Sequence, residues 1–299
     1  MLYILLKMGY YSSMESLQDT PLESYPELAE KLGIPGLLFK REDMGRYGSH
    51  KGRSIPFMID TYSNEGKTAF AISSSGNAAR AAIEHIQKAH PQAKLTVFVG
   101  THINNEKLDY LRNSISSDNI QLEQVERPLQ SLTALTKDGT VQSLRQSTDK
   151  LALAGYQSLA NELMDIETDG VFIPTSSGTT AEALLTFTNL PIHIVQTEKC
   201  HPIAKAFGTD APSADTSIAD ALVDSIAHRK DSIATKLHEN NGNAWVPNED
   251  TIRKAMQLTE ETTGIFLSPN SAVAIAGIME ATKNGFSPSR PIIALITGK

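Results

Sequence analysis

From residue 53 to its end, the chain alternates short apolar segments with longer amphipathic ones. The short segments are rich in Val, Ile and Leu, are bounded by turn-forming residues, and predict strands at 68–72, 95–99, 120–125, 171–173, 192–196 and 292–296. The longer segments place apolar residues at helical spacing and predict helices at 77–89, 106–113, 156–166, 180–188, 249–262 and 271–284. Strands that alternate with helices form parallel sheets covered by helices, so the pattern predicts an α/β fold.

Three segments depart from this alternation. The polar segment 127–149 lacks a clean strand pattern and is predicted to be a boundary or a mobile connection, and 210–216 is predicted to be a surface loop. The apolar segment 1–6 is too short and too soon interrupted for a signal sequence and predicts an N-terminal strand or packing arm. No fixed-period repeat is present, so solenoids and coiled coils are excluded.

Composition narrows the class of protein. With 299 residues and 40% hydrophobic residues, the chain can form one large domain or two unequal domains that share a cleft. Its net charge of −7 is scattered, which makes nucleic acid and anionic membranes poor partners. No apolar stretch approaches the roughly 20 residues of a membrane span. Cys200 is the single cysteine, so an intramolecular disulfide is impossible and we expect a reducing, cytoplasmic location.

Three predicted strands are followed by small, hydroxyl-rich, glycine-containing loops at 73–77, 174–180 and 297–299. Loops at the carboxyl ends of parallel strands form the binding crevice of such sheets. The loop at 175–180 opens a helix, where backbone N–H groups and hydroxyls can hold a phosphate. An ordinary Ser/Thr cap that serves only the helix is the alternative interpretation.

A glycine-rich segment at 45–52 carries Lys51 just before a helix. A nucleotide-binding P-loop would need Gly-Lys-Ser/Thr, whereas the order here is Lys-Gly-Arg. A lysine in such a place can form a Schiff base with a carbonyl cofactor, although most lysines are solvated surface cations. His50 precedes it and is either a proton-transfer group or a packing residue.

The sequence gives little support for a serine hydrolase or for a metal site. The Gly-x-Ser-x-Gly turn of many serine hydrolases is absent from the sequence. His85 and His90 lie five residues apart, and Cys200 is adjacent to His201, so neither pair has the usual spacing of metal ligands. The sequence therefore predicts no metal site.

Taken in chain order, these segments resemble the fold type II pyridoxal-phosphate enzymes, the tryptophan synthase β superfamily. The likeness is carried by Thr-Pro-Leu at 20–22, Leu-Phe-Lys-Arg-Glu-Asp at 38–43, Gly-Ser-His-Lys at 48–51, and the loops at 73–79, 176–180 and 296–298. The resemblance implies two open sheets covered by helices. It also implies a larger cofactor-binding domain of residues 1–52 and 150–299, a smaller mobile domain of residues 53–149, and pyridoxal 5′-phosphate between them.

The resemblance also implies roles for individual residues. Lys51 would form the Schiff base with the cofactor and then act as acid and base at the substrate Cα. Asn77 would bind the cofactor's ring hydroxyl, and Thr297 the pyridine nitrogen. A hydroxyl partner leaves that nitrogen largely unprotonated, which suits β- and γ-elimination or replacement. The substrate carboxylate would dock on Ser74, Ser75 and Gly76, and the cofactor phosphate would be held by Ser176, Ser177, Gly178, Thr179 and Thr180.

Segments 195–203 and 264–272 look most like the threonine-synthase branch. This implies a homodimeric lyase or transferase of amino-acid metabolism that acts on a small hydroxy- or phospho-amino acid. A serine/threonine ammonia-lyase is the first alternative. A catalytically weak homologue that binds the cofactor or a metabolite for regulation is the second, because Thr179 stands where the family has glycine and the chain stops at Lys299.

Overall fold

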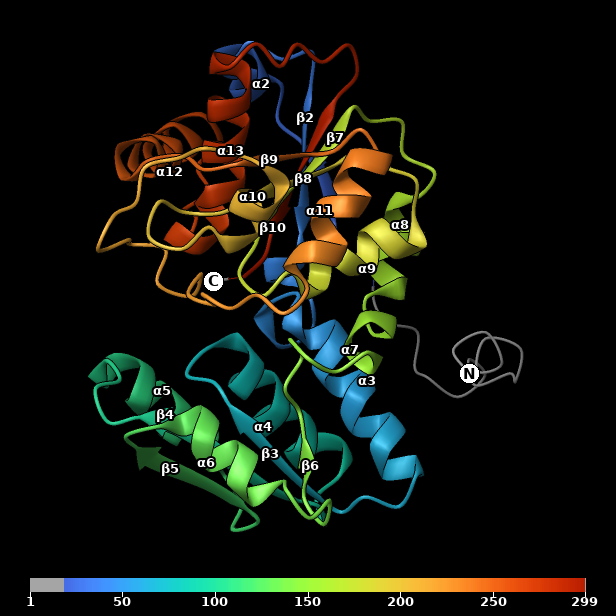
Figure 1. The fold of residues 1–299 in the computed structure, drawn as a ribbon, viewed down its shortest axis with the longest axis vertical. Helices are drawn as coiled ribbons and strands as arrows, with labels where there is room; N and C mark the ends of the chain where they lie inside the picture. The colour runs from blue at the N-terminus through green and yellow to red at the C-terminus, as the bar shows by residue number, and fades with distance from the viewer. Residues whose placement is uncertain (1–18, 299) are drawn as a thin grey trace.

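Two separate sheets organise the chain in the computed structural model, which describes residues 19–298 (Figure 1). The N-terminal strand or arm predicted at residues 1–6 lies outside the described residues. Between the two sheets, the chain also forms the short helical turns η2 (Glu42–Met44) and η3 (Arg46–Gly48) and the helix α7 (Leu151–Ala154).

The larger sheet has six strands in the order β1 (Leu22–Ser24), β2 (Leu37–Arg41), β10 (Ile292–Ile296), β7 (Gly170–Pro174), β8 (Ile192–Val195) and β9 (Asn243–Trp245). Only β1 runs antiparallel to its neighbour. One face packs on α2 (Pro26–Leu32), α12 (Glu249–Thr263) and α13 (Pro269–Lys283). The other face packs on α8 (Gln157–Leu163), α9 (Thr179–Phe187), α10 (Pro202–Phe207) and α11 (Lys230–Glu239).

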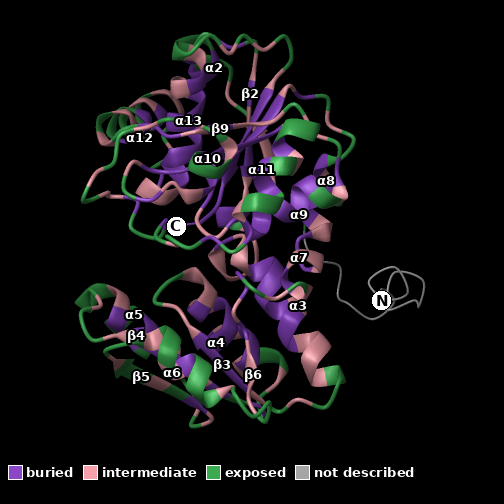
Figure 2. Cartoon of the chain, viewed as in Figure 1, coloured by how far each residue is buried: buried purple, intermediate pink, exposed green. Residues whose placement is uncertain are grey.

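Burial on both faces explains why the central strands read as unbroken apolar runs. In β10, Ile292 and Ala294 belong to one core cluster, whereas Ile293 and Leu295 belong to the other. Side chains of a strand alternate between the two faces, and helices cover both faces here, so polar residues have no place in the strand. Figure 2 shows the strands and the inward faces of α9 and α13 as the buried centre of this unit.

The smaller sheet is entirely parallel, in the order β5 (Ile120–Val125), β4 (Lys94–Gly100), β3 (Ala69–Ser73) and β6 (Gln142–Ser143). Its main core joins the sheet to α3 (Lys51–Asn64), α4 (Asn77–Ala89) and α5 (Asn105–Ser114). On the other face, α6 (Pro128–Leu135) contributes Leu132, which packs on Ala71 and Phe98.

The α/β class with two helix-covered sheets is confirmed, and each predicted strand and helix has a counterpart in the structure. For the segment 127–149 we predicted a boundary or a mobile connection. The structure corrects this, because the segment contains α6 and β6. The sequence pattern also missed β1, β2 and β9, which are short or lie near the chain start. None of the described helices combines the length and apolarity needed to cross a membrane.

A buried ionic network fixes the start of α3 to the larger sheet. The Arg53 guanidinium lies 2.7 Å from a Glu42 carboxylate oxygen and 2.5 Å from one of Glu162. Lys40 in β2 adds a 2.5 Å contact from Nζ to Glu162. Burial pushes the pKa of Glu162 up, but the hydrogen bonds and charges of Arg53 and Lys40 outweigh it and hold the pKa below its usual value. The network thus ties β2, α3 and α8 together.

We expect Arg53→Ala to lower the free energy of unfolding by about 3–5 kcal/mol, because removing one partner leaves buried charge uncompensated. The measurement is urea unfolding followed by circular dichroism. Arg253→Ala is the matched control, since that side chain is 61% exposed and, among the described residues, forms an ion pair only with Glu249 on the same helix. It should change stability by less than about 0.5 kcal/mol. Equal effects of the two variants would contradict this account of the network.

Candidate active site

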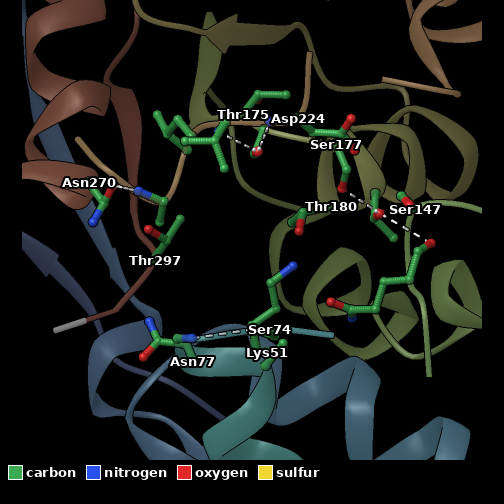
Figure 3. A pocket seen from close by; sticks show the side chains of 18 of the residues that line it. Lys51, Ser74, Asn77, Ser147, Thr175, Ser177, Thr180, Asp224, Asn270 and Thr297 are labelled. Atoms are coloured by element: carbon green, nitrogen blue, oxygen red, sulfur yellow. Dashed lines mark hydrogen bonds between the residues drawn. The ribbon is translucent and has the colours of Figure 1, made fainter. Parts of the chain in front are cut away.

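A cavity of about 590 Å³ lies between the two sheets, at the carboxyl ends of β3, β7 and β10. This volume is typical of a site for a small molecule. Figure 3 shows the lysine side chain of Lys51 pointing into it. The lining includes every residue for which the sequence predicted a site role: Lys51, Ser74, Ser75, Gly76, Asn77, Ser176, Ser177, Gly178, Thr179, Thr180 and Thr297.

Lys51 is positioned by a tight, glycine-dependent turn. It is the first residue of α3 and follows η3, in which Tyr47 has a φ of 59° and Gly48 a φ of 68°. A Cβ on Gly52 would lie 1.8 Å from the carbonyl oxygen of Arg46, so only glycine fits there. Two glycines therefore let the chain fold back closely enough to start the helix with its lysine facing the cavity.

The Lys51 amine makes no hydrogen bond or ion pair with any described residue, so it is an unpartnered amine facing the cavity. Burial lowers its pKa to about 8, because the surrounding protein disfavours the charged form. Its neighbour His50 has a pKa lowered to about 3, by burial first and by the charge of Lys51 second. His50 is therefore neutral at physiological pH, and its Nδ1–H donates to the Thr297 carbonyl oxygen at 2.7 Å.

The loop after β7 turns into α9 through Gly178, whose φ is 85°. A Cβ there would also lie 2.2 Å from Cδ1 of Ile233 in α11, so this position needs glycine for both reasons. The first turn of α9 presents backbone N–H groups to the cavity without intrahelical partners. Such a helix start attracts a phosphate group.

The hydroxyls of this loop face different partners. Ser176 Oγ accepts hydrogen bonds from the backbone N–H groups of Val223 and Asp224, at 3.1 and 3.2 Å. Thr179 is buried, and its hydroxyl bonds to the Gln146 carbonyl at 3.4 Å and lies 3.1 Å from Ser177 Oγ. Thr179 and Gln146 both line the cavity, which is open with the Thr179 side chain in place.

The loop after β3 leads into α4, where Asn77 is the first helical residue. Ser75 and Gly76 are exposed to the cavity, and the Gly76 N–H bonds to Ser74 Oγ at 3.3 Å. The first-turn N–H groups of α4 have no intrahelical acceptors and can receive a carboxylate. This loop offers anion-binding groups from the smaller sheet, opposite those of α9.

Thr297 is held at the end of β10 by α13. Ser271 Oγ lies 3.5 Å from the Thr297 hydroxyl and 2.7 Å from the Gly298 carbonyl oxygen, to which it donates. A Cβ on Gly298 would lie 2.5 Å from Nδ2 of Asn77, so glycine lets the two sheets approach at this point. Thr297 and Asn77 are thereby brought to the same end of the cavity, as Figure 3 shows.

Sequence reasoning missed several residues that shape this cavity. Gln146 and Ser147 line it from the segment after β6, and the buried Arg229 guanidinium fixes that segment through the carbonyl oxygens of Gln146 and Asp149 at 2.9 and 2.7 Å. The segment 220–226 lines the other side, and its Asp220 pairs with Lys107 of α5 at 2.5 Å. Neither segment carries a local motif, so only the folded chain reveals it.

Comparisons with known proteins identify the class of site. A family model described as pyridoxal-phosphate dependent enzyme matches residues 14–298. Among solved structures, maize serine racemase is 17% identical with a TM-score of 0.78, over 94% of this chain and 88% of that one. Threonine deaminase isoform 2 from Solanum lycopersicum is 20% identical with a TM-score of 0.77, over 94% and 83%. L-Serine ammonia-lyase from Rhizomucor miehei is 15% identical with a TM-score of 0.76, over 94% and 93%.

At these identities the solved structures establish the shared fold, and the family match confirms the predicted cofactor, pyridoxal 5′-phosphate. The chemistry of the cavity fits this group. An unpartnered lysine with a lowered pKa can bind an aldehyde, a helix start with added hydroxyls can bind a phosphate, and the cavity can contain a planar ring between them.

We expect the cofactor-free protein to form its Schiff base with added cofactor about ten times faster at pH 9 than at pH 7. The neutral amine of Lys51 is the nucleophile, and the pKa of this amine is about 8. The neutral fraction of an ordinary lysine, with a pKa near 10.4, would instead rise about 100-fold over this range without levelling off. The measurement is the rate of visible absorbance gain, with N-α-acetyl-lysine as the control for the cofactor's own titration. Lys51→Ala should give no borohydride-reducible adduct, and an adduct mapped to another lysine would contradict the assignment.

Proposed function

Because the chain belongs to the pyridoxal-phosphate-dependent enzymes, we propose that it is a lyase that eliminates the β-substituent of a small hydroxy-amino acid. The observation that carries this proposal is that the starts of two helices, α9 and α4, line one cavity together with the Lys51 amine. The bound cofactor would supply an electron sink for the carbanion formed when a proton leaves the substrate Cα.

The residues of this chain would hold that cofactor at three points. Lys51 would attach to its aldehyde, and the α9 helix start with Ser177 and Thr180 would hold its phosphate. Asn77 would contact the ring hydroxyl. The Thr297 hydroxyl would face the pyridine nitrogen and, being no carboxylate, would leave it largely unprotonated, which favours elimination over reactions that need a stronger electron sink.

Lys51 would also move the substrate proton. Its free amine would be neutral for much of the time near pH 8 and would take the Cα proton. The loop Ser74, Ser75 and Gly76 would hold the substrate carboxylate and so orient Cα toward that amine. The smaller sheet carries this loop, so closure of its unit over the substrate would exclude water.

The charged residues of the cavity lining are balanced. Beside Lys51, the lining carries two cations, Lys107 and Arg145, and two carboxylates, Asp220 and Asp224, and Lys107 is paired with Asp220. The likeness to threonine synthases rests on segments 195–203 and 264–272, and only the second contributes cavity residues, Ser268 and Asn270. Phospho-amino acids are therefore a weaker proposal.

A racemase is the second candidate function. It begins with the same removal of the Cα proton, and serine racemase from maize shares this fold. The regulatory alternative, a catalytically weak homologue, predicts cofactor binding without turnover of any amino acid.

The proposal is tested by incubating the holoenzyme with L-serine, L-threonine, L-homoserine and their O-phospho forms. We expect formation of a 2-oxo acid and ammonia from L-serine or L-threonine, detected by a coupled dehydrogenase, and none with Lys51→Ala. Chiral chromatography of the same mixtures detects D-amino acids, which would establish the racemase instead. Phosphate release from a phospho-amino acid alone would favour the threonine-synthase type. No change in products or cofactor spectrum with any substrate would contradict the proposal.

We expect Ser75→Asp to weaken amino-acid binding by about tenfold or more while the cofactor spectrum is retained. Two carboxylates about 4 Å apart repel each other by roughly 1–4 kcal/mol between water and a protein surface. The measurement is titration of the cofactor absorbance with the substrate identified above. Ser287→Asp is the control, since it introduces the same charge at an exposed serine outside the cavity lining. If the wild type and both variants bound the amino acid with equal affinity, the substrate carboxylate would have to bind at another place.

A further inference from the structure

A cluster of Asp60, His85 and His90 lies outside the cavity, in the smaller unit. Asp60 belongs to α3, His85 to α4, and His90 follows the last residue of α4. One ligand-type atom from each residue lies within 4.8 Å of the other two. The two histidines are five residues apart and did not suggest a metal site from sequence, but the packing of α3 against α4 adds the third group.

This donor set suits a transition-metal ion. Two imidazole nitrogens and one carboxylate oxygen form a common three-ligand arrangement for Zn²⁺, with water in the fourth position. Mg²⁺ and Ca²⁺ prefer oxygen ligands, so an imidazole pair discriminates against them.

The remaining nitrogen of His85 also has the partner that a metal ligand needs. His85 Nδ1 lies 2.9 Å from Tyr47 Oη, and Nε2 points to Asp60. A ligating histidine usually donates its other N–H to an oxygen, which fixes the tautomer and the ring orientation. With a metal on Nε2, the Nδ1–H of His85 would donate to Tyr47.

The three side chains of the cluster differ in how far they are exposed to solvent. The His85 side chain is 2% exposed, whereas Asp60 and His90 are 33% and 23% exposed. An ion can therefore enter from solvent past Asp60 and His90 and bind the rigid His85. At present the Asp60 Oδ1 atom lies 2.6 Å from His85 Nε2 and 2.7 Å from His90 Nε2, as a shared hydrogen-bond acceptor. Ligands of tetrahedral Zn²⁺ lie about 3.3 Å apart, so the carboxylate oxygen must move roughly 0.6 Å away from each histidine nitrogen. The two nitrogens, which lie within 4.8 Å of each other, must adopt the same spacing.

We propose that Asp60, His85 and His90 form a binding site for one Zn²⁺-type transition-metal ion per chain, separate from the cofactor cavity. Binding replaces the Nε2 proton of each histidine with the metal, and that proton passes to solvent. An imidazole that lacks an Nδ1 proton takes one up from solvent, so each bound imidazole is neutral with its proton on Nδ1. His85 then donates its Nδ1–H in a hydrogen bond to Tyr47. Tyr47 lies in the turn just before Lys51, so the metal site and the active-site loop share one hydrogen bond.

The test uses untagged holoenzyme that has been treated with a chelator and dialysed. Zn²⁺ is titrated against a chromophoric chelator, and bound metal is counted by mass spectrometry. We expect one Zn²⁺ per wild-type chain and no comparable binding of Mg²⁺. Asp60→Asn and His90→Gln should each lower the affinity at least about 100-fold, because removing a ligand costs more than the 10- to 100-fold loss seen for a ligand's supporting partner.

Two further variants sharpen the assignment. His102→Gln removes an exposed histidine of the same unit and should leave Zn²⁺ affinity unchanged. Tyr47→Phe should lower it about tenfold, because His85 loses the acceptor for its Nδ1–H. Circular dichroism and the cofactor absorbance verify that each variant is folded and loaded. Asp60 and His90 are both partly exposed, so replacing them disturbs folding less than replacing the buried His85 would.

The proposal is overturned if the wild-type protein binds no Zn²⁺, or if both ligand variants bind it as tightly as the wild type. The cluster would then be a hydrogen-bonded group only. A Tyr47→Phe affinity equal to that of the wild type overturns the assignment of His85 Nε2 as a ligand. Neither result depends on catalytic activity, so the proposed lyase function stands or falls separately.

Discussion

The position of Lys51 depends on the buried ion pairs of Arg53, two residues further along α3. Arg53 is held by Glu42 after β2 and by Glu162 in α8, so the first turn of α3 is fixed to the larger sheet. The same helix then continues into the core of the smaller unit through Ile55, Met58 and Ile59. A buried ion pair adds little net stability compared with apolar packing, but it allows only one arrangement of its partners. Here that arrangement places the lysine at the meeting point of both sheets.

The network also keeps unpaired carboxylates away from Lys51. A free carboxylate near an amine favours its charged form, whereas an unpaired guanidinium disfavours it. Glu42 and Glu162 neutralise Arg53 and Lys40, and burial is the cause that lowers the pKa of Lys51. A largely neutral surrounding is suited to an amine that must lose and regain a proton near neutral pH.

Much of the site could be predicted from the sequence because it lies where parallel strands end. Once β3, β7 and β10 are identified, the shared direction of the strands brings their following loops to one edge of each sheet. What could not be predicted depends on tertiary contacts. β9 has three residues and carries no pattern of its own. Likewise, Arg229 fixes Gln146 from 83 positions away, and no local signal marks that pair. The polarity of 127–149 suggested a boundary or a mobile connection, but the buried Leu132 packs α6 on the sheet.

The same reasoning accounts for the histidine cluster. Spacing rules recognise ligands that one helix or turn brings together, and His85 and His90 do not meet them. Asp60 joins them only because α3 must lie beside α4 to cover the smaller sheet, and α3 lies there because its first turn is fixed by Arg53. The contact from His85 to Tyr47 then returns to the turn that precedes Lys51. Tyr47 has a φ of 59°, which is unfavourable for a tyrosine, and such a conformation persists only when the surrounding contacts hold it. The hydrogen bond to His85 is one of those contacts, so the cluster helps to hold the turn from which the lysine extends.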